Sequence, residues 1–240
     1  MSTGRGRLLV GTSGFAYPDW SPRFYPPGLK GDALLRHYAT RLPAVELNNT
    51  FYRSPSAASV GTWLDATPED FRFSVKAQRG GSWRAFGGVP DPGLPWLTDP
   101  LRGFGDRLGT VLFRIPDTIK RDDDRLGALL AAWPRDLPLT VEFRDPSWAV
   151  DEVTALLRDA GAVICATDAP EDASPPMLRR TGPFLYLRLR RHDYTPGEVA
   201  AWHDRLEPFL AVGDDVFVFF RHDETGRGAE LALELRATFD

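Results

Sequence analysis

Short apolar runs recur along this chain, and this recurrence restricts the possible folds more than any other feature of the sequence. Each run has the length of a β-strand, is rich in Val, Ile, Leu or Phe, and ends in polar or charged residues. The runs cover residues 8–14, 44–50, 72–78, 110–116, 139–144, 162–168, 184–190 and 215–222. Helical stretches follow most of them, so the pattern predicts an α/β fold, a TIM-like (β/α)8 barrel with a parallel sheet inside a layer of helices.

The connections between the runs carry helix-start signals, with two exceptions. Predicted helices cover residues 32–42, 56–64, 122–133, 151–160, 196–211 and 228–239, and Asp32, Ser56, Asp122 and Asp151 are the predicted caps. Residues 78–107 are rich in Gly, Pro and Trp, so we expect them to be mostly irregular. They either pack over one barrel end or serve function. Residues 170–183 contain too many prolines for a full helix. We expect irregularity around strands 3–4 and 6–7, within a single barrel domain over residues 1–240.

Composition limits where the protein works and what it binds. The formal net charge of -4 argues against general nucleic-acid binding but permits a local basic pocket. Cys165 is the single cysteine, and its apolar neighbours predict a buried structural thiol. One cysteine permits no internal disulfide, which fits a reducing compartment. We find no secretory signal and no membrane span, and therefore expect a cytoplasmic protein with no membrane partner.

Active sites of such barrels lie at the carboxyl ends of the strands, so the polar strand exits are the candidate site. Side chains two residues apart on a strand share a face, which pairs Glu46 with Asn48, Glu142 with Arg144, and Arg188 with Arg190. Apolar residues alternate with them and must face the helices, so the charged faces turn inward. Charges inside a barrel are costly unless they are paired or open to solvent. These inward-facing charges fit two interpretations, a self-contained salt-bridge network and a ligand site.

Further candidates lie at the other strand exits. The turn after the first strand offers Thr12 and Ser13 for anion binding, or it is a plain strand-exit turn. Tyr17 and Tyr52 belong to aromatic clusters that form either a stacking wall or a small satellite core.

Metal and cofactor sites receive little support from the sequence. His37 and His203 fall within predicted helices, and no histidine pair has ligand spacing, so we expect no dedicated metal site. A magnesium site built only from carboxylates, among Glu46, Glu142, Asp168 and Asp223, stays open. No dinucleotide or Walker motif is present, and we expect no cofactor.

Several of these segments together resemble the YecE-like family, domain of unknown function 72, over nearly the whole chain. The segments that carry the resemblance are 11–15 with Tyr17 and Trp20, 24–26, 45–52, 73–76, 141–144 and 146–148. The resemblance implies a TIM-like barrel and brings no activity with it. This chain departs from the family pattern at residues 77–81, at Arg114, at Arg190 and Arg191, and at Arg221 and His222. These departures make the far side of the site more basic, which implies an altered ligand preference or none.

The leading hypothesis is an enzyme, or a former enzyme, that acts on a small anionic, phosphate-bearing ligand at the barrel mouth. Glu46, Glu142 and Lys76 are the predicted catalytic residues. The predicted ligand-binding residues are Thr12, Ser13, Tyr17, Asn48, Tyr52, Arg114, Arg144, Asp168, Arg188, Arg190 and Asp223. The alternatives are a glycoside-type hydrolase that uses Glu46 and Glu142, a noncatalytic protein that binds a metabolite or a nucleic-acid end, and a scaffold that docks through residues 78–107. The sequence names no protein partner.

Overall fold

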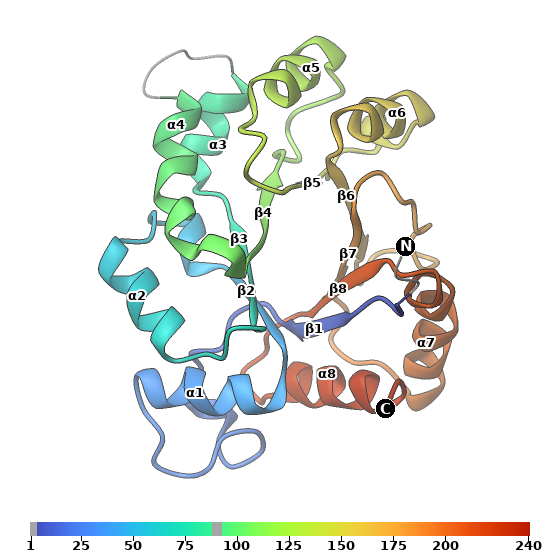
Figure 1. The fold of residues 1–240 in the computed structure, drawn as a ribbon. Coiled ribbons are helices and arrows are strands. Elements are labelled where there is room, and N and C mark those ends of the chain that lie inside the picture. The colour runs from blue at the N-terminus through green and yellow to red at the C-terminus, as the bar shows by residue number, and fades with distance from the viewer. Residues whose placement is uncertain (1–3, 88–92) are drawn as a thin grey trace.

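Parallel strands form the centre of the molecule. The computed structural model describes residues 4–87 and 93–240, and within them eight parallel strands form a nearly closed barrel surrounded by helices (Figure 1). The strands are β1 (Leu8–Thr12), β2 (Ala44–Leu47), β3 (Arg72–Lys76), β4 (Leu108–Arg114), β5 (Leu139–Glu142), β6 (Val163–Asp168), β7 (Phe184–Leu189) and β8 (Asp215–Phe220). Each coincides with one of the apolar runs, so the predicted barrel is confirmed.

The helices follow the strands as the pattern predicts. They are α1 (Asp32–Arg41), α2 (Ala57–Asp65), α3 (Arg79–Phe86), α4 (Gly93–Thr98), α5 (Asp123–Ala132), α6 (Asp151–Ala160), α7 (Pro196–Ala211) and α8 (Arg227–Ala237). Short 3-10 turns lie at η1 (Pro18–Trp20), η2 (Asn49–Phe51), η3 (Asp99–Arg107) and η4 (Pro146–Trp148). Residues 170–183 contain no helix, as expected from their prolines.

Two of the four predicted helix caps are wrong by one position. The side chains of Ser56 and Asp122 accept hydrogen bonds from the backbone N–H groups three residues later and cap α2 and α5. Asp32 and Asp151 are instead the first residues of α1 and α6. From there a carboxylate still favours the positive end of the helix dipole, but it does not cap the helix.

The connection between β3 and β4 is more regular than its composition suggests. The expected irregular segment 78–107 contains α3, α4 and η3 in its described part, while residues 88–92 lie outside the described residues. The Gln78 side chain accepts a hydrogen bond from Gly81 N–H at 2.7 Å and caps α3. Phe86, Leu97 and Phe104 from this segment are buried in the core, and their packing outweighs the low helix propensity of the glycines.

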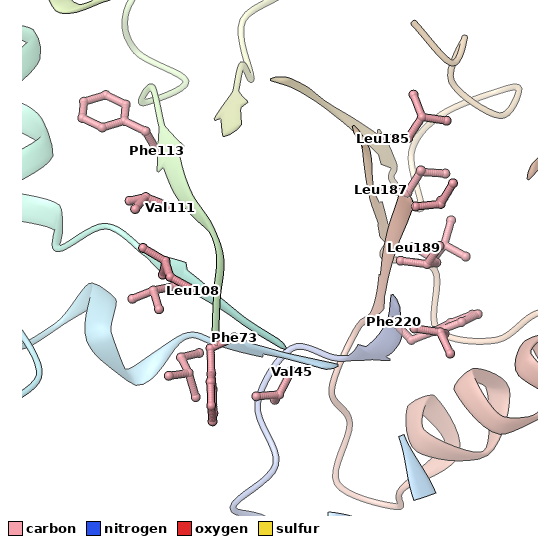
Figure 2. Close-up of a cluster of buried hydrophobic side chains, with 14 of the residues drawn as sticks. Val45, Phe73, Leu108, Val111, Phe113, Leu185, Leu187, Leu189 and Phe220 are labelled. Atoms are coloured by element: carbon pink, nitrogen blue, oxygen red, sulfur yellow. The ribbon is translucent and has the colours of Figure 1, made fainter. Parts of the chain in front are cut away.

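The strands carry one apolar core on their outer face and a second inside the barrel. Val45, Phe113 and Leu187 point outward from the strands toward the helices, as Figure 2 shows. The second core fills the inside with apolar and aromatic side chains. Its members are Leu9, Ala44, Leu112, Val163, Cys165, Phe184, Tyr186, Phe217 and Phe219. This alternation turns every second strand residue inward, and the inward residues become charged near the carboxyl ends of the strands.

The barrel closes between β1 and β2 through few direct hydrogen bonds. Gly14 N–H donates to Glu46 O at 2.8 Å at the upper end of the seam. Lower down, the Tyr38 hydroxyl lies between the strands: it accepts from Thr12 N–H at 2.8 Å and donates to Ala44 O at 3.0 Å. A tyrosine of α1 therefore replaces a direct backbone bond and fixes the spacing of the two strands.

We predict that Gly11→Ala disrupts this seam. A Cβ at Gly11 would lie 1.9 Å from Ala44 O, so β1 and β2 would have to separate. We expect a loss of about 2 kcal/mol or more in the free energy of unfolding, measured by urea denaturation. Gly127→Ala in α5 is the matched control, because its Cβ meets open space, and alanine should stabilise that helix by about 0.5–1 kcal/mol. A Gly11→Ala variant as stable as wild type would contradict the role of the seam.

Candidate functional site

A buried arginine joins two carboxylates at the centre of the barrel mouth. Arg188 of β7 donates from Nη1 to Glu142 Oε1 and from Nη2 to Glu46 Oε1, each at 2.8 Å. The three side chains are 3%, 1% and 0% exposed for Arg188, Glu142 and Glu46. They come from three strands that only barrel closure brings together, and we call them the central ion cluster. The inward phasing predicted for them from strand periodicity is the arrangement that the structure has.

Glu46 has hydrogen bonds on both carboxylate oxygens. Besides Arg188, Ser13 Oγ donates to Oε1 at 2.8 Å and the Tyr186 hydroxyl donates to Oε2 at 2.7 Å. Burial by itself raises the pKa of Glu46, but the charges of Arg188 and Lys76 outweigh burial and hold the pKa at about 2. A carboxylate with so low a pKa is a weak proton acceptor at neutral pH. Glu46 is therefore suited to holding the cluster together rather than to moving protons.

Glu142 keeps one oxygen free of hydrogen bonds. Its Oε1 accepts from Arg188 and, at 3.4 Å, from Thr167 Oγ1. Its Oε2 has no hydrogen-bond partner among the described residues, and Arg114 Nε lies 3.9 Å away. Burial raises the pKa of Glu142, and the nearby Arg188 charge and hydrogen bond lower it by more. Of the two carboxylates, Glu142 is the one that can still accept a proton from a bound molecule.

Lys76 ends β3 beside the central ion cluster. Its Nζ lies 4.4 Å from the centroid of the Phe51 ring, and the residue is 8% exposed, more than any member of the cluster. Burial and the Arg188 charge lower the pKa of Lys76 to about 8, against the opposite effect of Glu46 and Glu142. The amine is therefore partly neutral near physiological pH, in contrast to an ordinary lysine.

The arginines at the strand exits differ in whether they are paired. Arg144 forms an ion pair with Glu171 at 3.3 Å, and no contact joins it to the central ion cluster within the described residues. Arg190 has no carboxylate within ion-pairing distance in the described part of the chain, and burial and the Arg188 charge lower its pKa. Arg114 has only distant partners, with Asp117 at 3.8 Å. The mouth thus has more positive than negative charge.

A groove of about 720 Å³ opens beside the cluster, next to the ends of β2, β3 and β4. Phe51, whose ring lies against Lys76, lines this groove. Arg114, whose Nε lies 3.9 Å from Glu142, lines it as well. Tyr52 and Trp83 also line it, and they are 79% and 57% exposed. Exposed aromatic rings next to arginines can bind the apolar or planar part of a ligand.

Three of the predicted binding residues make contacts that hold the local fold. Asp223 accepts hydrogen bonds from the backbone N–H groups of Arg227 and Gly228 and so holds the start of α8. Asp168 accepts from the Tyr194 hydroxyl at 2.8 Å and pairs with Arg191 at 3.1 Å. Thr12 is fully buried in the β1–β2 seam.

The other predicted residues lie closer to the mouth. Ser13 bonds Glu46, and Tyr17 stacks on His222 with ring centroids 5.0 Å apart. Asn48 directly follows β2, and its buried Oδ1 has no hydrogen-bond partner among the described residues. An unpaired buried acceptor is costly, so this oxygen is available to a polar ligand.

Several residues that contact the central ion cluster or lie directly below it are not among those predicted from the sequence. Tyr186 and Ser74 hydrogen-bond each other at 2.6 Å below the cluster, and Thr167 bonds Glu142. Tyr186 lies two residues before Arg188, and Ser74 lies two residues before Lys76. Thr167 is paired with Arg188 in the register of β6 and β7. Two-residue periodicity could therefore have predicted all three. Phe51, which lies against Lys76 in a 3-10 turn, belongs with Tyr52 to the aromatic cluster that the sequence offers as a stacking wall or a satellite core.

Two further properties bear on the site. Within residues 4–87 and 93–240, no three His, Cys, Asp or Glu side chains gather as potential metal ligands. In the same ranges, none of the helices combines the length and the apolar character needed to cross a bilayer.

Comparison with known proteins identifies relatives along nearly the full chain. The family model for "Protein of unknown function DUF72" matches residues 9–240. The UPF0759 protein YunF of Bacillus subtilis (strain 168) is 24% identical over an alignment of 273 residues, which covers 97% of this chain and 95% of YunF. The crystal structure of a DUF72 family protein from Thermotoga maritima MSB8 has a TM-score of 0.81 and 27% identity, covering 97% of this chain and 99% of that one. A DUF72 family protein from Enterococcus faecalis V583 has a TM-score of 0.75 and 22% identity, covering 87% and 94%.

We predict that Glu46 makes stability depend on acid pH. Its pKa is depressed in the folded protein, from 4.5 to about 2, so between these values the unfolded chain binds a proton that the folded chain does not. The contribution is full above pH 4.5 and is lost as the pH falls through about 2, a change of about 3 kcal/mol. Urea unfolding of wild type and Glu46→Gln at several pH values tests this. The stability difference between them should shrink by that amount between pH 5 and 2, and a constant difference would contradict the assignment.

Proposed function

The chain belongs to the DUF72 family, and we propose that it is an enzyme, or descends from one, that acts on a small anionic, phosphate-bearing ligand at the carboxyl mouth of the barrel. The observation that carries this proposal is the charge balance around the central ion cluster. Arg188 neutralises much of Glu46 and Glu142. Lys76 and Arg190 have no carboxylate within ion-pairing distance among the described residues, and Arg114 has only the distant carboxylates of Asp117 at 3.8 Å and Glu142 at 3.9 Å.

These cations suit an anion better than a neutral ligand. Buried or half-buried positive charges with no partner or only distant ones are costly, and a phosphate group can offset that cost through charge-assisted hydrogen bonds. Arg114 and Arg190 carry planar guanidinium groups that match phosphate oxygens. The groove lined by Tyr52 and Trp83 would receive the remainder of the molecule.

The proton-transfer role falls to Glu142 in this proposal. Its Oε2 is free of hydrogen bonds within the described residues, whereas both oxygens of Glu46 are occupied. A hydrolase of glycosides receives less support, because such enzymes need one carboxyl group to act as an acid. Here the pKa values of both glutamates are lowered by the arginine between them.

A cytoplasmic location accompanies this proposal. Cys165 lies buried inside the barrel and is the only cysteine of the chain, so the fold uses no disulfide. The proposed phosphate-bearing ligand also agrees with a cytoplasmic location.

We predict that the two arginines at the mouth bind inorganic pyrophosphate, used as the probe anion. Arg114→Gln with Arg190→Gln should weaken its binding at least tenfold, because each change removes a charge-assisted contact. Isothermal titration calorimetry at low salt measures the affinity. Arg135→Gln is the control, since this exposed arginine precedes β5 at the opposite end of the barrel and should leave binding unchanged. Equal affinity of the double variant and wild type would exclude anion binding at this mouth.

Glu142→Gln separates an enzyme from a noncatalytic binder. Removing this negative charge should preserve or strengthen pyrophosphate binding by a few-fold, because the charge repels the anion. Any turnover of phosphorylated metabolites found for wild type should fall by about 10²–10⁴-fold in the variant. A variant that keeps both binding and turnover would remove Glu142 from the reaction.

A further inference from the structure

The chain almost always uses arginine where it needs a positive charge. It contains 26 arginines and only three lysines, Lys30, Lys76 and Lys120. Lys30 and Lys120 are exposed, and Lys76 is the buried one. A site that needed only a fixed charge here would be served by arginine, which cannot lose its proton and binds anions with two parallel hydrogen bonds. A lysine at this position points to amine chemistry.

The surroundings of Lys76 leave its amine available. No carboxylate of the described residues lies within ion-pairing distance of Nζ, because Arg188 holds both Glu46 and Glu142. The amine instead lies against the face of Phe51, whose ring also lines the groove. At 8% exposure, Lys76 is more accessible than Glu46, Glu142 and Arg188. A molecule that enters from the groove therefore meets the amine before it meets the two carboxylates.

We propose that Lys76 Nζ forms an imine with a small anionic aldehyde or ketone bound at the barrel mouth. The inference rests on the proposed function, since Arg114 and Arg190 would hold the anionic group of the carbonyl compound. It adds a substrate class and a covalent step. Lysine amines become nucleophiles in proteins when they are desolvated or placed next to other cations, and both conditions hold for Lys76.

The step balances with the groups present. The Lys76 ammonium gives one proton through a bridging water to Glu142 Oε2, and the neutral nitrogen adds to the carbonyl carbon as the C–O π bond opens onto oxygen. A second proton moves from nitrogen to that oxygen and gives a carbinolamine. Glu142 then returns its proton to the hydroxyl group, which leaves as water as the C=N bond forms. The product is a protonated imine, and no oxidant or reductant is needed.

Two observations support this division of labour. The Lys76 pKa is lowered to about 8, so about a tenth of the amine is neutral at pH 7, against about 0.03% of an ordinary lysine. Glu142 lies close enough to influence that pKa through its charge, and its Oε2 is unoccupied among the described residues. The first proton therefore has an acceptor in the same mouth, and it reaches Glu142 through water because the two groups are not in direct contact.

Reductive trapping tests the proposal directly. The protein is incubated at pH 7 with glycolaldehyde phosphate and sodium cyanoborohydride, and peptide mass spectrometry measures labelling at each lysine. We expect Lys76 to be labelled at least tenfold faster than Lys30 and Lys120, with a rate that rises with pH and levels off above about 8. Labelling of Lys76 no faster than of the two exposed lysines overturns the proposal.

A second probe separates this inference from the proposed function. Glycolaldehyde has the same carbonyl group without the phosphate. If it labels Lys76 as fast as the phosphate ester does, imine formation stands and the preference for an anion fails. If neither probe selects Lys76 while pyrophosphate still binds, the anion site stands and the imine fails.

Lys76→Arg provides the matched variant, because it keeps the positive charge. It should bind pyrophosphate within a few-fold of wild type and leave no lysine that is labelled faster than Lys30 and Lys120. Circular dichroism and urea unfolding verify that the variant folds. Selective labelling that persists at any other residue of the mouth in Lys76→Arg would show that Lys76 is not the reacting group.

Discussion

The contact of Arg188 with Glu46 and Glu142 is the interaction on which the rest of the mouth depends. An ionised carboxylate inside a protein is stable only with a charged partner and hydrogen bonds, and here one guanidinium serves two of them at 2.8 Å. Because β2, β5 and β7 each supply one member, the cluster joins strands that are not neighbours in the sheet. It also determines which groups remain free. Both carboxylates are engaged with Arg188, so Lys76 has no ion-pair partner among the described residues and Glu142 retains one unoccupied oxygen.

The inside of the barrel is apolar at one end of its axis and charged at the other. Below the cluster, Tyr186, Phe217 and Phe219 fill the interior with rings, and the outward faces of the strands pack against the helices (Figure 2). Above the cluster, side chains are charged and several polar atoms lack partners within the described residues. An apolar floor excludes water beneath the charges and so strengthens their mutual interaction. The same environment lowers the pKa of Lys76, since burial disfavours its charged form.

Strand periodicity predicts much of this arrangement from the sequence alone. The eight apolar runs give the strands, and the alternation around Glu46, Glu142 and Arg188 gives their inward orientation. The two-residue periodicity applies only within a strand, so it does not predict how side chains beyond a strand end are oriented. Arg144 continues the phase of Glu142 but lies beyond β5 and turns to Glu171. The partner of each arginine depends on distances between strands far apart in the sequence, and the helices within 78–107 depend on buried aromatic residues whose packing a local pattern does not contain.

The stability of Arg188→Met relative to a triple variant tests the central ion cluster most directly. Removing the guanidinium alone leaves two buried carboxylates without a counter-charge and should cost about 3–5 kcal/mol in urea unfolding at pH 7. Arg188→Met combined with Glu46→Gln and Glu142→Gln removes all three charges, and it should be at least about 2 kcal/mol more stable than Arg188→Met, because no buried charge remains unpaired. A loss below about 1 kcal/mol in the single variant, or a triple variant no more stable than the single one, would contradict the account.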